Sequence, residues 1–220
     1  NVGGIPIFIL RKNVDCPLNY ERLPLTTPLS EIVFTVYDTE ATGFQVSKND
    51  RMIELGAVVV NGMEVCEERQ FQTYVNPHRQ ISREITELTS ISKEMVENAP
   101  NALEAISSFF EFVEKSNSAS FVGHHVAFDM LVLKHELKRE KLSYRKYISI
   151  DTLDLIRAVS PQQEGKDLET YAHAFRTKIY QRHSALGDAL TTAHLFVELL
   201  RRLEDRGIRT FGELLRLARR

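Results

Sequence analysis

The chain has 220 residues, 43% of them hydrophobic, which suits one domain with an appendage and a full apolar core. No apolar stretch approaches the ~20 residues of a membrane span, so we expect no membrane-spanning segment. A net charge of −2 neither supports nor excludes a nucleic-acid partner. Cys16 and Cys66 lack the spacing of a metal site or a disulfide framework, which favours a reduced, cytoplasmic protein.

Residues 1–30 contain four of the seven prolines and show little periodicity. We expect an N-terminal extension or linker there, with a short edge strand at Ile5–Leu10. The first ten residues lack the basic region and cleavage site of a signal peptide. Two roles for the extension stay open, namely packing against the domain and connection to a segment upstream.

Three strands are predicted next. Ile32–Tyr37 is apolar almost throughout, which is typical of a central strand covered on both faces. Met52–Val60 is a second apolar run, and Met63–Val75 shows partial alternation. The dipeptide Asn61-Gly62 between these two runs is a strong hairpin signal. The order predicts an antiparallel meander.

Helices dominate the remainder of the chain. Ser82 and Ser92 are candidate caps of short helices, and apolar spacing predicts further helices later in the chain. Those helices cover Ala102–Lys115, Val126–Lys141, Leu153–Val159, Leu168–Phe175, Ala185–Leu203 and Thr210–Arg220, with short strands at Ala119–Gly123 and Tyr147–Ile150. We therefore expect an α/β domain over residues 31–205 with a mixed five-stranded sheet. A basic helix within residues 206–220 would pack on it or be appended to it.

Two acids stand at the end of the first strand. Asp38 and Glu40 are two residues apart, so on an extended chain both side chains point to the same side. Burying two neighbouring carboxylates is costly, and a divalent cation removes that cost because Mg²⁺ and Mn²⁺ prefer hard oxygen ligands. The alternative is a solvated strand end with no ligand.

Three further residues are candidates for the same site. Asp129 falls in the first turn of a predicted helix, where the helix dipole favours a carboxylate. Asp188 begins the apolar face of a long helix, where an acid needs a partner. His183 precedes it by five residues and therefore belongs on the loop before that helix. Taken singly, Asp129 is equally well a helix-start acid and His183 a solvated histidine.

Together these residues resemble the DnaQ-like 3′–5′ exonucleases, the DEDDh branch of the ribonuclease-H-like fold, which includes the DNA polymerase III epsilon subunit and RNase T. The matching motifs are Asp38-Thr39-Glu40 with Thr42-Gly43, then Phe128-Asp129, then His183 and Asp188. The resemblance covers roughly residues 32–203. The sequence departs from the family pattern at Ala41, at Ser90 and at His125, where an Asn is common.

The resemblance implies an enzyme that needs two divalent cations, Mg²⁺ or Mn²⁺, and releases 5′-mononucleotides from the 3′ end of single-stranded or frayed DNA. It implies that Asp38, Glu40 and Asp188 hold one cation. Asp38 would also bridge to the second, which Asp129 supports, and His183 would act as the general base. Residues expected to contact the substrate are Thr39, Thr42, Gly43, Phe44, His125 and Phe128.

Several alternatives stay open. Phe44 either stacks on a terminal base or packs in the core. The substrate is a DNA 3′ end, in proofreading or repair, or an RNA 3′ end, since no residue reads a 2′-hydroxyl reliably. A third possibility is a nucleic-acid-binding module associated with a DNA polymerase subunit.

Overall fold

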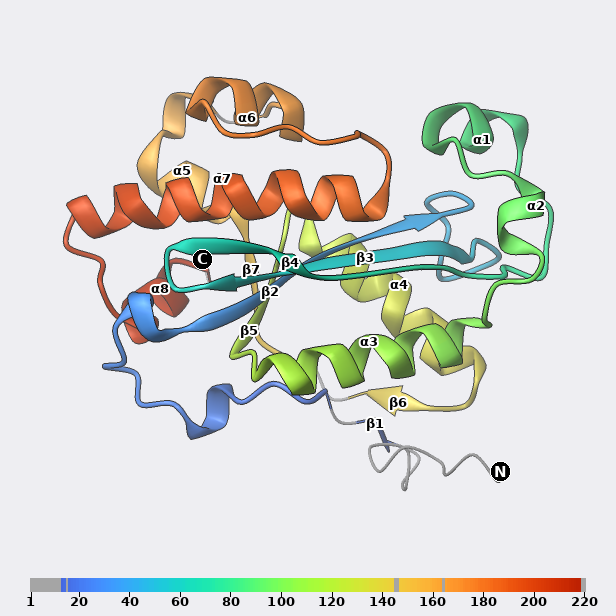
Figure 1. The fold of residues 1–220 in the computed structure, drawn as a ribbon, viewed down its shortest axis with the longest axis horizontal. Coiled ribbons are helices and arrows are strands. Elements are labelled where there is room, and N and C mark those ends of the chain that lie inside the picture. Colours follow the sequence, from blue (N-terminus) through green and yellow to red (C-terminus); the bar gives the residue numbers. More distant parts are fainter. Residues whose placement is uncertain (1–12, 15, 145–146, 164, 219–220) are drawn as a thin grey trace.

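The computed structural model describes residues 13–14, 16–144, 147–163 and 165–218, and a five-stranded mixed sheet forms its centre (Figure 1). The strand order is β4-β3-β2-β5-β7, with β2 paired antiparallel to β3 and parallel to β5. The strands are β2 (Val33–Ala41), β3 (Met52–Asn61), β4 (Glu64–Tyr74), β5 (Ser120–Gly123) and β7 (Ser149–Asp151). The predicted fold class is confirmed, including the antiparallel meander of the first three sheet strands. The predicted strand Ile5–Leu10 and the last two residues of the predicted C-terminal helix lie outside the described residues.

The central strand β2 is longer than its apolar run. It continues past Tyr37 to Ala41 because β3 pairs with it along its whole length, with Asp38 opposite Gly56 and Glu40 opposite Glu54. The two carboxylates therefore project from the last residues of a paired strand rather than from a loop after it. A side chain on a strand that is paired with its neighbour has little freedom, which suits a site that must hold its geometry.

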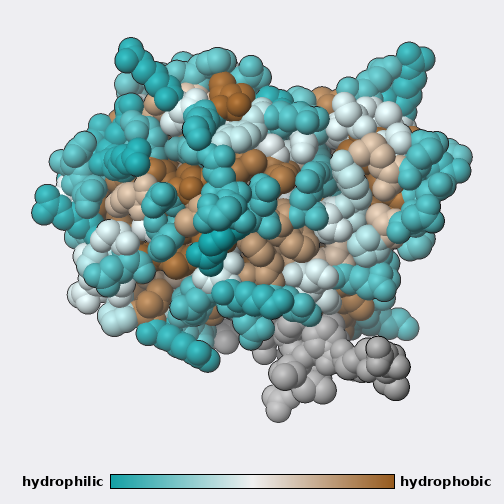
Figure 2. All heavy atoms as spheres, viewed as in Figure 1, coloured by the Kyte–Doolittle hydropathy of each residue, from teal (hydrophilic) through white to brown (hydrophobic). Residues whose placement is uncertain are grey.

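Helices cover both faces of the sheet (Figure 1). The helices are α1 (Arg83–Thr89), α2 (Lys93–Val96), α3 (Ala102–Ser116), α4 (Val126–Arg139), α5 (Thr152–Val159), α6 (Leu168–Phe175), α7 (Ala185–Asp205) and α8 (Phe211–Leu217). Side chains of α5 to α8 pack with Phe34 and Val36 in one apolar cluster. Side chains of α3 and α4 pack with Tyr37 and Phe121 in a second cluster. On the face shown in Figure 2, hydrophilic side chains lie over most of the periphery and apolar ones show between them.

The caps explain where several helices begin and end. The Ser82 hydroxyl accepts a hydrogen bond from the Ile85 amide, as predicted for an N-cap. Asn101 and Glu104 form a reciprocal capping box at the start of α3. Ser90 ends α1 with a φ of 62°, a left-handed conformation in which glycine is the most comfortable residue. The departure from the family pattern at Ser90 therefore leaves the turn intact.

Segments from the two ends of the described chain lie side by side. The amides of Phe211 and Gly212 donate to the carbonyls of Thr27 and Leu25, each within 2.9 Å. Phe211 and Leu214 of α8 are buried in the same cluster as α7. Of the two roles left open for the N-terminal extension, packing against the domain is therefore observed for this part of it. The domain boundaries at residues 30 and 205 stay predictions.

One small element has no signal in the sequence. The strands β1 (Asn13–Val14) and β6 (Ser143–Tyr144) form a separate parallel pair. Cys16 and Cys66 are both free. Across the part of the chain that the structure describes, no helix combines the length and apolarity that a membrane crossing requires.

Candidate active site

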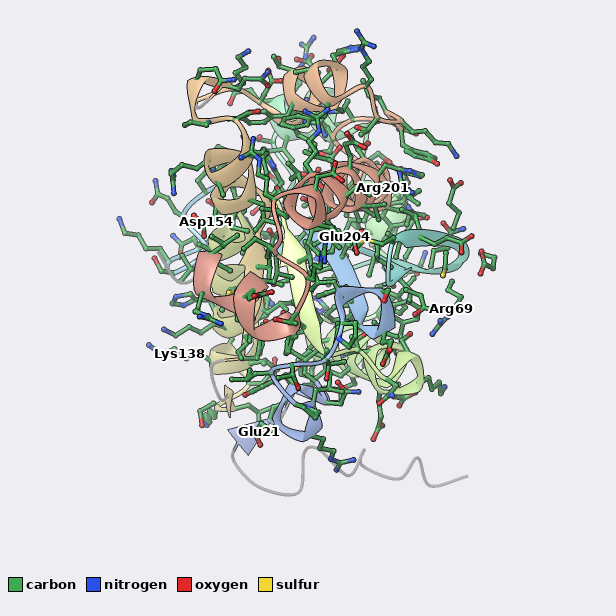
Figure 3. The ribbon with its side chains drawn as sticks, turned by 90° about the vertical axis from the view of Figure 1, so that its left-hand side faces the viewer. Glu21, Arg69, Lys138, Asp154, Arg201 and Glu204 are labelled. Carbon is green, nitrogen blue, oxygen red and sulfur yellow. The ribbon has the colours of Figure 1, made fainter. Side chains whose placement is uncertain are left out.

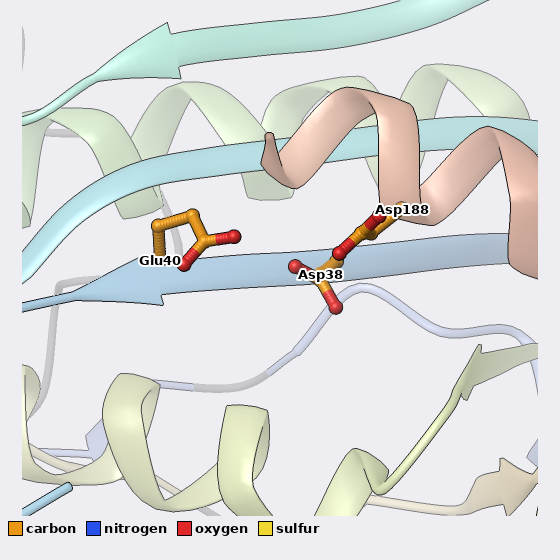
Figure 4. A group of neighbouring side chains, drawn as sticks. All are labelled: Asp38, Glu40 and Asp188. Carbon is orange, nitrogen blue, oxygen red and sulfur yellow. The ribbon is translucent and has the colours of Figure 1, made fainter. Parts of the chain in front are cut away.

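Three carboxylates meet above the sheet. Asp38 and Glu40 point from β2 toward the first turn of α7, which carries Asp188 (Figure 4). One oxygen from each of the three lies within 4.8 Å of the others. Asp188 is 7% exposed, whereas Asp38 and Glu40 are half-buried. The fold therefore brings together three acids that lie up to 150 positions apart in the chain, and their shared role stays a prediction.

Two glycines allow close backbone contacts at the start of α7. A Cβ atom on Gly56 of β3 would lie 2.2 Å from the Leu186 amide nitrogen, and one on Gly187 would lie 1.9 Å from the Gln181 carbonyl oxygen. Both distances are far below van der Waals contact, so a side chain at Gly56 would push the start of α7 away from the sheet, and one at Gly187 would displace the loop before α7. The position of Asp188 over β2 therefore depends on Gly56, and the path of the preceding loop depends on Gly187.

Asp129 lies beside this group but outside it. It is 3% exposed in the first turn of α4, as predicted. Its Oδ1 accepts hydrogen bonds from the Thr39 amide at 2.9 Å and the Thr39 hydroxyl at 2.7 Å. Thr39 lies between the two acids of β2 and points to the other face of the sheet. Its hydroxyl is thus committed to orienting Asp129, and its predicted contact with substrate stays a prediction.

The acids repel one another and have lost water. Burial, the Asp129 charge and the Glu40 charge raise the pKa of Asp38 well above its usual value. Burial and the Glu54 charge raise the pKa of Glu40 to about 7. Burial raises the pKa of Asp129 to about 7, against the lowering effect of its two bonds from Thr39. Such a cluster of hard oxygen ligands with uncompensated negative charge fits a divalent cation.

Arg182 partly offsets this charge, and no motif in the sequence selects it. Its Nη1 donates to Oδ1 of Asp188, forming an ion pair in which the two side chains are 21% and 10% exposed. Its charge also lowers the pKa values of Asp38 and Glu40. The only available signal was its place directly before His183.

Glu54 is the second functional residue that sequence reasoning missed. It is 1% exposed on β3, and its Oε2 accepts a hydrogen bond from the Ala185 amide at 2.9 Å, at the first residue of α7. Its Oε1 accepts from Gln72 at 2.6 Å. Glu54 therefore anchors the helix that carries Asp188. A glutamate inside the apolar run Met52–Val60 is the feature that marks it in the sequence.

His183 lies where the sequence placed it, on the loop before α7. It is exposed, and its backbone is left-handed with a φ of 58°. Its amide donates to Oδ2 of Asp188 at 3.3 Å, which ties the loop to the acid. Burial and the Arg182 charge lower the pKa of His183, so its imidazole is neutral at pH 7. An exposed neutral imidazole can take up a proton.

The loop after β2 exposes one large apolar side chain. Phe44 is 86% exposed, and its ring lies against that of Phe128 with centroids 5.7 Å apart. Core packing, one of the two alternatives for Phe44, is therefore wrong. The Thr42 hydroxyl is buried and bonded to Asp50 and to the Arg51 amide, each at 3.0 Å.

Two other residues that are predicted to contact the substrate are Gly43 and His125. Gly43 has no room for a side chain, because a Cβ atom there would lie 2.5 Å from Oδ2 of Asp50. His125 is exposed and left-handed, with a φ of 60°, directly before α4. Its amide donates to Oδ1 of Asp151 at 3.2 Å. Contacts of these residues with a substrate stay predictions.

Comparison with known proteins defines the class. Residues 35–196 match the family described as exonuclease, the RNase T family. These residues contain all five candidate catalytic side chains. The chain therefore belongs to the DnaQ-like family of 3′–5′ exonucleases.

The relatives are larger proteins. The chain is 36% identical over 194 residues to a DNA polymerase III subunit epsilon-like protein of Rhodobacter capsulatus, covering 86% of this chain and 27% of the relative. It is 34% identical over 198 residues to the PolC-type DNA polymerase III of Caldanaerobacter subterraneus, covering 88% of this chain and 14% of the relative. It is also 34% identical over 185 residues to the 3′-5′ exonuclease DinG of Bacillus subtilis, covering 84% and 19%. The chain thus spans about a quarter or less of the length of these relatives.

Solved structures agree on the fold. Exonuclease X in complex with 5′-overhanging duplex DNA superimposes with a TM-score of 0.65 at 20% identity, covering 84% of this chain and 99% of that one. The nuclease domain of 3′hExo, a DEDDh family member bound to rAMP, gives a TM-score of 0.68 at 19% identity, covering 78% and 92%. At these identities the likeness establishes the ribonuclease-H-like fold alone.

Proposed function

We propose that this protein is a metal-dependent 3′–5′ exonuclease that removes 5′-mononucleotides from single-stranded or frayed DNA ends. One observation carries the proposal: in an exonuclease-family domain, oxygens of Asp38, Glu40 and Asp188 lie within 4.8 Å of one another. Burial and mutual repulsion raise the pKa values of Asp38 and Glu40, as expected of a site built for cations.

The four acids would hold two divalent cations, Mg²⁺ or Mn²⁺. Asp38, Glu40 and Asp188 would hold the first, and Asp38 with Asp129 the second. Cations bound there would neutralise the phosphate charge and make a water a better nucleophile. Thr39 keeps the Asp129 carboxylate in place with two hydrogen bonds, and Glu54 keeps α7 in place through the Ala185 amide.

His183 is the proposed general base. A base must be neutral to accept a proton, and the lowered pKa of His183 leaves its imidazole neutral at pH 7. The side chain is exposed, so a phosphate and a water have access to it. The amide of His183 is bonded to Asp188, which keeps this loop beside the acids.

The substrate end is proposed to rest on Phe44. An exposed aromatic ring that already packs on Phe128 offers one open face to a terminal base. Three residues, Ala41, Thr42 and Gly43, separate this ring from Glu40 at the end of β2. The scissile phosphate at the acids and the terminal base at Phe44 would thus belong to the same nucleotide, which favours action at an end.

DNA is proposed over RNA because the relatives include proteins named as DNA polymerase III and its epsilon-like subunit. The same names suggest association with a polymerase and a role in proofreading. An RNA 3′ end is the second candidate, since one similar structure is described as bound to rAMP.

Matched 5′-labelled DNA and RNA oligonucleotides, incubated with Mg²⁺, Mn²⁺ or EDTA, test these alternatives on one gel. The proposal predicts stepwise shortening of DNA from the 3′ end with either cation and none with EDTA. Faster shortening of RNA would make the chain an exoribonuclease. Intact DNA and RNA under every cation would contradict a nuclease and favour a binding module.

A further inference from the structure

Both oxygens of the Asp188 carboxylate have donors within the chain. Oδ1 accepts from Nη1 of Arg182, and Oδ2 accepts from the His183 amide at 3.3 Å. The ion pair is largely sheltered from water, with 21% of the Arg182 side chain and 10% of the Asp188 side chain exposed. A cation held by the three acids would need at least one of these oxygens, so it would compete with Arg182 for the carboxylate.

The charge of Arg182 acts on the other acids of the cluster as well. Burial and the neighbouring carboxylates raise the pKa values of Asp38 and Glu40, and the Arg182 charge lowers them in part. A bound divalent cation would act on these groups in the same direction and with twice the charge. A cation and a guanidinium at one carboxylate would also repel each other. Arg182 therefore supplies part of the positive charge that the acids need, and a cation that binds them would displace it.

The backbone on both sides of Arg182 is held in place. The Tyr180 amide donates to the Thr191 hydroxyl of α7 at 3.0 Å. On the other side, the His183 amide donates to Asp188, and α7 begins two residues later. An arginine side chain has several rotatable bonds, so the guanidinium can change its partner while the loop stays where it is. After leaving Asp188 it would thus remain beside the acids.

A phosphate suits a guanidinium that has left Asp188. The proposed reaction brings a phosphodiester to the same acids, and the guanidinium fork matches two phosphate oxygens at once. Asp167, which precedes α6, is an alternative partner, because hydrogen bonds from Thr170 and, to a smaller extent, the Arg182 charge lower its pKa. The Asp167 carboxylate is exposed and already accepts from the Thr170 amide at 2.7 Å, so water would screen an ion pair there. The phosphate is therefore the favoured partner.

We propose that Arg182 exchanges partners: it pairs with Asp188 before a divalent cation binds, and it then donates to the phosphate of the substrate at the same site. The inference rests on the proposed nuclease function, because that function supplies the cation and the phosphate. Two consequences distinguish this residue from one that forms a structural ion pair. Arg182 weakens cation binding, because the cation must displace it. It strengthens phosphate binding only when the cation is present.

Two binding measurements test this exchange, and neither depends on hydrolysis. Binding of Mn²⁺ is followed by electron paramagnetic resonance. Binding of thymidine 5′-monophosphate, and of thymidine as its phosphate-free match, is followed by calorimetry in Mn²⁺ and in EDTA. Arg182→Gln removes the guanidinium, and Asp167→Asn removes the alternative partner. Arg201→Gln is the control, because it removes the same charge from an exposed side chain thirteen residues beyond Asp188 on α7 (Figure 3).

Arg182→Gln should bind Mn²⁺ roughly three- to tenfold more tightly than the wild type, because the competing guanidinium is gone. In Mn²⁺ it should bind thymidine 5′-monophosphate roughly tenfold more weakly and thymidine equally well, since it lacks the charge-assisted bonds to phosphate. In EDTA it should not differ from the wild type toward the mononucleotide. Arg201→Gln and Asp167→Asn should match the wild type in every binding measurement.

Thermal melting separates the exchange from a structural ion pair. Arg182→Gln should melt below the wild type at pH 8 in EDTA, where the acids lose a compensating charge, and should match the wild type in saturating Mn²⁺. A structural pair would lower the melting temperature equally in both conditions, and that result would overturn the exchange.

Three binding results would also overturn it: unchanged or weaker Mn²⁺ binding by Arg182→Gln, unchanged binding of the monophosphate, or an equal loss for thymidine and its monophosphate. An effect of Asp167→Asn on Mn²⁺ binding would do the same, because it would make Asp167 the second partner. A wild-type protein that binds no Mn²⁺ would refute the metal site of the proposed function together with this inference. Mn²⁺ binding and hydrolysis by the wild type, with Arg182→Gln indistinguishable from the control, would refute this inference alone.

Discussion

At the scale of single residues, the acids on β2 that the proposed function requires also lower the stability of the folded, metal-free chain. The unfolded chain releases the Glu40 proton near pH 4.5, whereas the folded, metal-free chain keeps it to about pH 7. The folded state therefore binds more protons in this interval, and its stability falls as the pH rises through it. One pKa unit corresponds to about 1.4 kcal/mol. The side chain of Glu40 is only half-buried, and solvent screening reduces the full effect, so the loss of folding stability across this interval is on the order of 2 kcal/mol.

Thermal unfolding in EDTA at pH 5 and at pH 8 measures this loss. We expect a lower melting temperature at pH 8, restored by Mg²⁺, because a cation replaces the missing protons. Asp38→Asn should melt higher than the wild type at pH 8 in EDTA, since it removes one of the repelling charges. A wild-type protein that is more stable at pH 8 without metal would contradict the electrostatic account of the site.

His183→Ala separates proton transfer from cation binding. Removing a general base is expected to lower kcat by roughly 10² to 10⁴, while Mn²⁺ binding, followed by electron paramagnetic resonance, stays unchanged. In the wild type, kcat should fall as the pH drops below the lowered pKa of His183, because the protonated ring cannot accept a proton. His173→Ala is the matched control, with a side chain 70% exposed on α6. Wild-type turnover by His183→Ala would remove this residue from the mechanism.

At the scale of elements, α4 holds the loop that carries Phe44. Nη2 of Arg139, near the end of α4, donates to the carbonyl oxygens of Val46, Lys48 and Asp50 at 2.7, 3.2 and 3.1 Å. The carbonyls of Val46 and Asp50 are in part-buried bonds and are costly to leave unpaired, whereas that of Lys48 is exposed. Arg139 therefore fixes the backbone of the loop without touching the acids.

Arg139→Ala should consequently raise KM several-fold and leave kcat nearly unchanged, because it loosens the platform for the terminal base and not the acids. Phe44→Ala should change KM in the same direction, and the two effects should not add, since both act through one ring. Lys138→Ala, the exposed neighbour on α4 (Figure 3), is the control. Steady-state kinetics on a single-stranded oligonucleotide would contradict this role if kcat fell and KM did not change.

Local patterns predicted the elements well because burial repeats along a strand or helix. Met52–Val60 and Leu168–Phe175 are apolar at the spacing that their final structure requires, so neighbours in sequence suffice to identify them. The sequence also indicated that β2 continues through its two acids, but the pairing of Glu40 with Glu54 on β3 is a tertiary register that no local pattern shows. The pair β1 and β6 was missed for the same reason.

The candidate site shows even more clearly that local sequence patterns do not predict tertiary contacts. Asp38 and Glu40 could be selected from their spacing on one strand, but Asp129, Asp188 and His183 joined them only through a family resemblance. Nothing local shows that Gly56 lets α7 approach the sheet, which brings Asp188 over β2. Arg182 and Glu54 were missed because each acts through a partner fixed by that approach, namely Asp188 and the Ala185 amide.

At the scale of the whole molecule, the sheet and α7 form one rigid frame that places three acids from two elements together. The frame has two apolar clusters, one on each face of the sheet, and β2 contributes to both. A change far along α7 should therefore leave the acids in place, whereas a change at its first turn should not. Glu204 lies exposed at the opposite end of α7 from Asp188, so it provides an internal control on the same helix (Figure 3).

The most direct test of the account is the single-turnover rate at which a 5′-labelled, single-stranded DNA oligonucleotide is shortened in Mg²⁺. The two variants Asp188→Asn and Glu204→Gln each remove one negative charge from α7, so they are matched in charge. We predict stepwise 3′ shortening by the wild type and by Glu204→Gln at equal rates, and a rate lower by at least roughly 10² for Asp188→Asn. Equal rates for Asp188→Asn and the wild type would contradict the assignment of the three-acid cluster as the catalytic metal site.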